Sequence, residues 1–152
     1  MTREETKQIL AKLVYAYPRL TFPKSVEGIT AVDVWYENLG DISFEDAKKA
    51  TAIAIQRSEF PPSIAEIRKA YGEIEDERKR VRLAIRQEYE AIRSYYPSCG
   101  EINNGWAEWQ ERCKDGETAR KLRNALYGYV RGVEENGGNC KEFSECIRTI
   151  EI

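Results

Sequence analysis

Two adjacent prolines, Pro61 and Pro62, constrain the fold of this 152-residue chain more than any other feature. Each lacks a backbone N–H and biases the residue before it towards extended geometry, so a helix cannot run through them. Ser63 follows as a predicted helix N-cap, and Glu66, three residues later, can complete a capping box. The sequence therefore predicts a helix that ends before the prolines, a rigid corner with Phe60 pinning it to a core, and a new helix from Ser63.

Three helices are predicted before the corner. The first is capped by Thr2 and stopped by Pro18, the second covers about residues 30–39, and the third is capped by Ser43. Small side chains on one face of the third helix would let its neighbours approach closely. The residues of this face are Phe44, Ala47, Ala50, Thr51 and Ala54. These features indicate a small helical bundle.

The helix that starts at Ser63 is expected to continue far beyond this bundle, as far as Pro97, with Gly72 as its weakest point. An acidic block followed by a basic block, residues 73–80, suits pairing along an exposed helix surface. Its apolar residues follow a 3–4 spacing, which is typical of a coiled-coil seam, a partner-binding face or the edge of a second core. They are Ile74, Val81, Ile85, Tyr89, Ile92 and Tyr96.

The last third contains too many large apolar residues for a disordered tail. Trp106 and Trp109 share a face if their segment is helical, a further helix follows Asp115, and a final helix is expected from about Lys141. The predicted fold class is therefore all-α, with a small N-terminal bundle, a long connecting helix and a second small helical unit. The expected domain boundaries are 1–72, 73–96 and 97–152.

Several kinds of chemistry find no support in the composition. The chain has no histidine, which removes the commonest general base and the histidine ligands of zinc. Its four cysteines form no Cys-x-x-Cys pair, so no metal site is predicted, and reduced thiols packed as small hydrophobes are the favoured interpretation. They are Cys99, Cys113, Cys140 and Cys146.

The sequence also lacks phosphate-binding glycine loops and a nucleophile elbow. We therefore expect no enzymatic activity and no cofactor, and a protein that works by binding. The net charge of −2 argues against a broad basic surface for duplex DNA. No apolar run approaches the ~20 residues of a membrane span, so we expect a cytoplasmic protein without membrane contact.

Three groups of residues are candidate binding surfaces. The basic cluster of the long helix could form an ordinary solvated surface, or contact a partner or a single strand; it comprises Arg78, Lys79, Arg80, Arg82 and Arg86. The other two groups are aromatic and could equally be core: Trp35 with Tyr36, and Trp106 with Trp109, preceded by Tyr95 and Tyr96.

Four stretches together carry a resemblance to a known family: Met1 to Thr6, Tyr15 to Pro18, Val34 to Glu45, and Glu59 to Arg68. In this order and spacing, residues 1–71 resemble the N-terminal domain of the bacteriophage helicase loader and inhibitor proteins of the Bacillus phage type. The resemblance implies a non-enzymatic adaptor of DNA replication in a bacterial host cell. Such adaptors bind the hexameric replicative helicase, hold it inactive and deliver it to an origin-bound initiator protein.

Candidate contact residues follow from this role. The helicase would be bound by one stripe of the long helix, for which the candidates are Arg78, Val81, Arg82, Ile85, Arg86, Tyr89 and Ile92. Trp35, Tyr36 and Phe60 are the candidates for the initiator contact. The alternative function is an accessory protein that binds single-stranded nucleic acid, with Trp106 and Trp109 stacking on bases.

Overall fold

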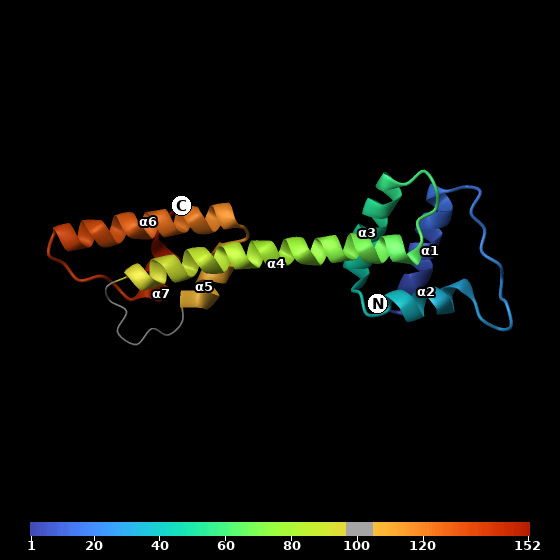
Figure 1. Cartoon of the computed structure of the whole chain (residues 1–152). Coiled ribbons are helices and arrows are strands. Elements are labelled where there is room, and N and C mark those ends of the chain that lie inside the picture. Colours follow the sequence, from blue (N-terminus) through green and yellow to red (C-terminus); the bar gives the residue numbers. More distant parts are fainter. Residues whose placement is uncertain (97–104) are drawn as a thin grey trace. The chain divides into compact units, whose positions relative to one another are not determined.

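The computed structural model describes residues 1–96 and 105–152, and within these two ranges the chain forms seven α-helices and no strand (Figure 1). The all-α prediction is confirmed. The chain divides into two compact units, Met1–Glu77 and Arg78–Ile152. The helices are α1 (Arg3–Ala16), α2 (Ala31–Leu39), α3 (Phe44–Arg57), α4 (Ile64–Tyr95), α5 (Gly105–Arg112), α6 (Gly116–Glu135) and α7 (Phe143–Thr149).

Side-chain caps start the helices of the first unit at the predicted residues. Thr2 and Thr30 each form a complete capping box, and the Ser43 hydroxyl accepts the amide of the third residue of α3. At the start of α4 the Ser63 amide donates to a Glu66 carboxylate oxygen at 2.7 Å, and the Glu66 amide donates to the Ser63 hydroxyl at 3.3 Å. These bonds satisfy amides that have no partner within their own helix.

The core of the first unit lies between α1, α2, α3 and the first turns of α4 (Figure 1). Helix α1 packs against both α2 and α3. The small-residue face of α3 is buried as predicted, because Ala47, Ala50, Thr51 and Ala54 lose nearly all their exposed surface. The other buried apolar residues are Ile9, Leu10, Leu13, Trp35, Leu39, Ile42, Ile67 and Ala70.

The corner before α4 is held differently from the prediction. Phe60 is 76% exposed, so it does not pin the corner to the core. Pro62 is buried instead, and the Tyr17 hydroxyl donates to the Ser58 carbonyl at 2.9 Å. A phenol with both a packing face and a donor can bind the free carbonyl at the end of α3, which a phenylalanine cannot do.

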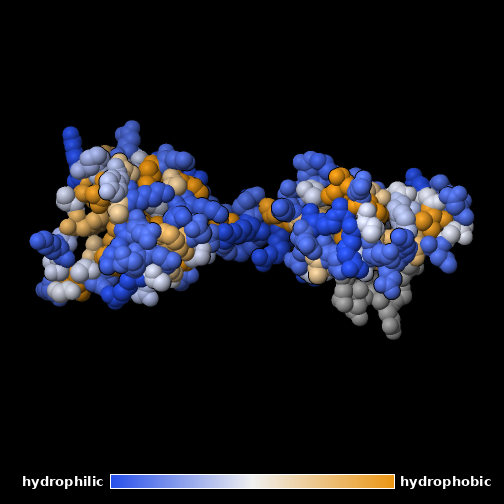
Figure 2. Space-filling model, turned by 180° about the vertical axis from the view of Figure 1, so that it is seen from behind, coloured by the Kyte–Doolittle hydropathy of each residue, from blue (hydrophilic) through white to orange (hydrophobic). Residues whose placement is uncertain are grey.

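Helix α4 continues through Gly72 and contributes to a separate core in each unit. Ile74 packs against the first core, and Val81 packs against the second. Residues 75–80 belong to neither cluster, and Figure 2 shows a hydrophilic surface over this part of α4. The charged segment that connects the two cores is therefore shorter than the expected connector, 73–96.

The core of the second unit is built around aromatic rings. Tyr89 on α4 lies edge-to-face with Trp106 and Trp109, with centroid distances of 5.0 Å and 5.6 Å, and Phe143 lies 5.8 Å away. The Trp109 indole nitrogen donates to the Ile85 carbonyl at 3.1 Å. Large aromatic side chains therefore fill this small core, and the buried indole nitrogen of Trp109 is satisfied by the backbone of α4.

Helix α6 lies beside the second half of α4 and runs in the same direction (Figure 1). Along this contact Arg123 forms an ion pair with Glu88, and the Tyr127 hydroxyl donates to the Ala91 carbonyl at 3.4 Å. Helix α5 packs against α7, and each also contacts α6. Gly105 permits the α5–α7 approach, since a Cβ there would come within 2.6 Å of an Ile147 side-chain carbon.

Candidate functional site

The stripe predicted to bind a helicase is divided between the surface and the core. Arg78, Arg82 and Arg86 are exposed on α4, and Val81 is half-buried. The remaining three candidates, Ile85, Tyr89 and Ile92, are buried in the core of the second unit and are inaccessible to a partner in this structure. Of the alternatives for the apolar spacing, the second core describes these three residues. The spacing located a buried face, but it could not show that α5, α6 and α7 cover it.

The exposed side of α4 carries a residue that the sequence analysis did not single out. Leu83 is 57% exposed between the exposed side chains of Arg82 and Arg86. We call Arg82, Leu83 and Arg86 the outer face of α4. Arg86 lies 4.0 Å from Glu90, whereas the described residues provide Arg82 with no ion pair. The available signal was a leucine outside the 3–4 apolar spacing of its own helix.

The three candidates for the initiator contact are not brought together. Trp35 is buried in the core of the first unit, with its ring 6.3 Å from that of Phe22. Tyr36 is half-buried beneath the Arg3 guanidinium, 5.4 Å from the ring centroid. Phe60 is the one candidate that presents most of its surface to solvent. The packing interpretation of Trp35 therefore applies.

Phe60 lies on an apolar surface of the first unit. A hollow of about 580 Å³ is lined by Phe60 and Pro61 from the corner and by Tyr17, Pro18 and Leu20 after α1. Tyr15 at the end of α1 is 88% exposed. Exposed aromatic side chains are more frequent at contact surfaces than elsewhere on a protein, so this surface is a second candidate for a partner.

The two tryptophans proposed to stack on bases belong to the second core. Trp109 is fully buried, and Trp106 is half-buried against the same cluster. A buried indole has no free face for a base, so Trp109 cannot stack on nucleic acid in this structure. The tryptophan pair was assigned correctly to a helix, but the sequence alone could not distinguish a core face from an exposed one.

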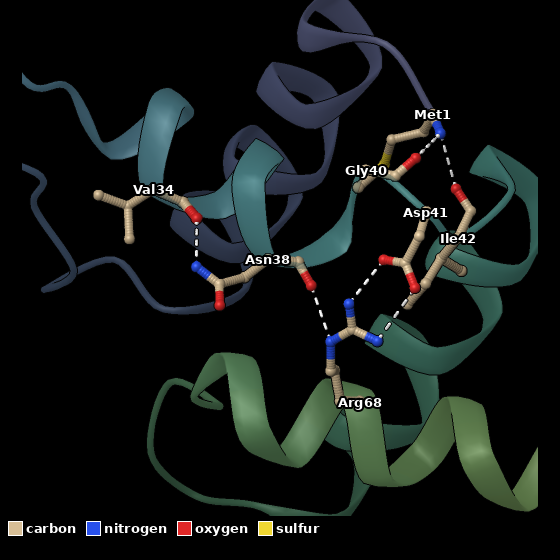
Figure 3. A network of polar contacts seen from close by, with 7 residues as sticks. All are labelled: Met1, Val34, Asn38, Gly40, Asp41, Ile42 and Arg68. Atoms are coloured by element: carbon tan, nitrogen blue, oxygen red, sulfur yellow. Dashed lines mark hydrogen bonds and ion pairs between the residues drawn. The ribbon is translucent and has the colours of Figure 1, made fainter.

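A polar network joins the start of α4 to the turn between α2 and α3 (Figure 3). Arg68 binds the Asp41 carboxylate with two nitrogens, at 2.6 Å and 3.2 Å, and its Nε donates to the Asn38 carbonyl at 2.7 Å. The hydrogen bond from Arg68 lowers the pKa of the Asp41 carboxyl below its ordinary value. Figure 3 also shows the Met1 ammonium donating to the carbonyls of Gly40 and Ile42 at 2.6 Å and 2.7 Å.

The cysteines and carboxylates gather no recognisable reactive centre within the described ranges. There, no group of three or more cysteine, aspartate and glutamate side chains could hold a metal ion. Cys113, Cys140 and Cys146 are free thiols, and Cys99 lies outside the described residues, as does Pro97. Burial raises the pKa of the Cys113 thiol to about 11, which keeps it protonated at neutral pH.

The fold and these surfaces define an all-α protein of two compact units with exposed aromatic and arginine-rich faces. Residues 1–68 match a family model, and the family is the N-terminal domain of a phage helicase loader and inhibitor. The match covers α1, α2, α3 and the first turn of α4, including both Asp41 and Arg68. It spans 68 of the 152 residues, so the second unit lies outside it.

A search of curated proteins gives no match to the chain, and neither does a search of solved structures. In the part of the chain that the structure describes, no helix combines the length and the apolar character that a membrane span requires.

Proposed function

We propose that this chain is a non-enzymatic adaptor that binds a hexameric replicative helicase, keeps it inactive and delivers it to an origin-bound initiator protein. The observation that carries the proposal is the match of residues 1–68 to the N-terminal domain of a phage helicase loader and inhibitor. An adaptor of this kind acts by covering a surface of the helicase, so it needs accessible contact residues and no catalytic group.

The outer face of α4 is the surface that we assign to the helicase. It combines an exposed leucine with two arginines, and arginine is one of the residue types enriched where interfaces derive most of their binding energy. The second unit has 14 Lys and Arg against 12 Asp and Glu, whereas the first unit has 10 against 14. The charge balance of the second unit therefore favours an acidic partner surface.

The apolar surface around Phe60 is the part of the first unit that we assign to the initiator. Phe60 and Tyr15 are its two most exposed aromatic residues. Its location within the matched domain and away from the outer face of α4 in the sequence allows one chain to carry two contacts. Trp35 has no part in this assignment because its indole is buried.

Charge reversal on the outer face tests the helicase assignment. Arg82→Glu, Leu83→Glu and Arg86→Glu in the full chain should each weaken binding to the immobilised helicase of the host by at least about tenfold, or about 1.4 kcal/mol. The matched control is Lys114→Glu, an exposed residue of the same unit without a described ion pair. It should bind within about twofold of the wild type.

Two results would count against the proposal. Wild-type affinity in all three variants would place the helicase contact elsewhere on the chain. Failure of the wild-type protein to bind the helicase, with or without ATP, would remove the proposed function itself.

A further inference from the structure

A hollow on the second unit has features that helicase binding does not explain. It has a volume of about 600 Å³ and is lined by Tyr95 from α4 and by Asn124, Tyr127, Gly128 and Arg131 from α6. The two helices lie side by side here, as the bond from the Tyr127 hydroxyl to the α4 backbone shows. A volume of this size is within the range of small-ligand sites.

Two tyrosines form one side of the hollow in a defined arrangement. The Tyr95 and Tyr127 rings lie edge-to-face with their centroids 4.7 Å apart, and Tyr95 is 43% exposed. The Arg123 guanidinium lies 5.8 Å from the centroid of the Tyr127 ring. The rings are therefore held by neighbours and still accessible, a combination that lets an aromatic ligand stack without first ordering the side chains.

The other lining side chains add a cation and an amide. Arg131 is exposed, and no residue in the described ranges forms an ion pair with it. The Asn124 amide oxygen accepts a hydrogen bond from Arg123 at 3.2 Å, which orients its NH2 group as a donor. A planar ring bearing hydrogen-bond acceptors, attached to an anion, would satisfy both groups at once.

Gly128 leaves the hollow open at a cost to its own helix. It lies in the middle of α6, and a Cβ at this position would meet no atom within 4 Å. Packing therefore does not require glycine here, and any other non-proline residue would favour the helix more. Gly132, one turn later, is equally unconstrained but does not line the hollow.

We propose that this hollow binds a nucleotide unit, with the base stacked on Tyr95 and Tyr127, Asn124 donating to the base edge and Arg131 paired with the phosphate. Stacking on aromatic rings next to a cation is how proteins bind single strands without sequence preference. None of the five lining residues has an aliphatic side chain, so the site lacks the anchor that a docked protein segment would use. The proposal does not depend on helicase binding.

Fluorescence anisotropy of the full chain with a fluorescein-labelled 20-mer of deoxythymidine tests this site. At about 50 mM salt the wild-type protein should bind the oligonucleotide, and Tyr95→Ala should bind about tenfold more weakly. Arg131→Ala should reduce the slope of log K against log salt by about 0.7, the value for one phosphate contact on a single strand. Thymidine monophosphate as competitor separates the two sources of the ligand: displacement assigns the site to a free nucleotide, and no displacement assigns it to a strand.

A matched pair of glycine substitutions separates binding from folding. Gly128→Gln and Gly132→Gln should both raise the midpoint of thermal unfolding, because glutamine favours a helix more than glycine. Gly128→Gln should also fill the hollow and weaken binding of the oligonucleotide by at least about tenfold, whereas Gly132→Gln should bind as the wild type does.

The proposal is overturned if the wild-type protein binds neither the oligonucleotide nor the mononucleotide at low salt. It is also overturned if the oligonucleotide binds equally well to Tyr95→Ala, Arg131→Ala and Gly128→Gln, because the contact then lies elsewhere. Loss of helicase binding in these variants, without nucleotide binding by the wild type, would instead make the hollow a protein contact.

Discussion

Individual residues in the first unit join segments that are distant in the sequence. Arg68 links α4 to the turn after α2 through the Asp41 carboxylate and the Asn38 carbonyl. Both charged side chains are largely exposed, so water screens their attraction and the pair contributes less than a buried pair would. The geometry of two bonds to one carboxylate nevertheless orients the start of α4.

Replacement of Asp41 should lower stability in a pH-dependent way. Because Arg68 lowers the pKa of this carboxyl below 3.8, the pair stabilises the folded state above that pH and ceases to do so as pH falls through the lower folded-state pKa. We expect Asp41→Asn to reduce the free energy of unfolding by up to about 1 kcal/mol at pH 7 and to have no effect at pH 2. Urea unfolding followed by tryptophan fluorescence measures both, with Glu59→Gln as the control; an equal loss at the two pH values would contradict the pair's role.

A methyl group at Gly105 should destabilise the second unit. The added Cβ would lie 2.6 Å from the Ile147 side chain and 2.9 Å from that of Phe143, so α5 and α7 would have to separate. We expect Gly105→Ala to cost about 1–3 kcal/mol of unfolding free energy. Gly132→Ala is the matched control and should gain up to about 1 kcal/mol, since nothing lies near its Cβ position. Thermal unfolding followed by circular dichroism compares the two, and a Gly105→Ala protein as stable as the wild type would contradict the close approach.

At the scale of helices, caps and breakers could be read from the sequence because they act through neighbouring residues. Thr2, Thr30 and Ser63 cap their helices as the sequence predicts. The role of Phe60 could not be read in this way, because whether an apolar side chain reaches a core depends on chain segments distant in sequence. Tyr17, 41 residues before Ser58, holds the corner instead.

The cap of α2 offers a test at this scale. Thr30→Ala removes the hydroxyl that accepts the Asp33 amide, and one amide at the start of α2 then loses its partner. The expected cost is about 1 kcal/mol of unfolding free energy, whereas Ser25→Ala in the preceding loop should be neutral. Urea unfolding followed by tryptophan fluorescence measures the difference. Equal stability of the two variants would show that the cap contributes nothing.

The long helix shows where periodicity ceases to inform about function. A 3–4 apolar spacing identifies a face that will be covered, but the covering segment can come from the same chain or from a partner. In this protein α5, α6 and α7 cover Ile85, Tyr89 and Ile92, and the accessible residues of α4 lie on its other side. Candidate contacts chosen from the stripe were therefore accessible in part only.

At the scale of the whole molecule, two separate cores predict two units that fold independently. A fragment of residues 1–77 contains every residue of the first core. Its amide NMR spectrum should overlay on that of the full chain for α1, α2 and α3. A fragment that ends at residue 62 lacks Ile67 and Ala70 and should be largely unfolded. A collapsed spectrum for 1–77 would show that the first unit depends on the second.

The charge of the two units differs in sign, with an acidic excess in the first unit and a basic excess in the second. This difference suits a chain whose halves contact different partners, because each half then repels the other's target. The sequence resemblance covered the first half alone, so it could not indicate the fold or the contacts of the second.

The central claim, that the chain acts by covering a replicative helicase, is tested most directly by the mass of their mixture. Size-exclusion chromatography with multi-angle light scattering, run on the full chain with the host's hexameric helicase and ATP, measures that mass. We predict one species heavier than the hexamer, containing both proteins and unwinding DNA more slowly than the free helicase. Separate elution of the two proteins at their own masses, with and without ATP, would contradict the claim.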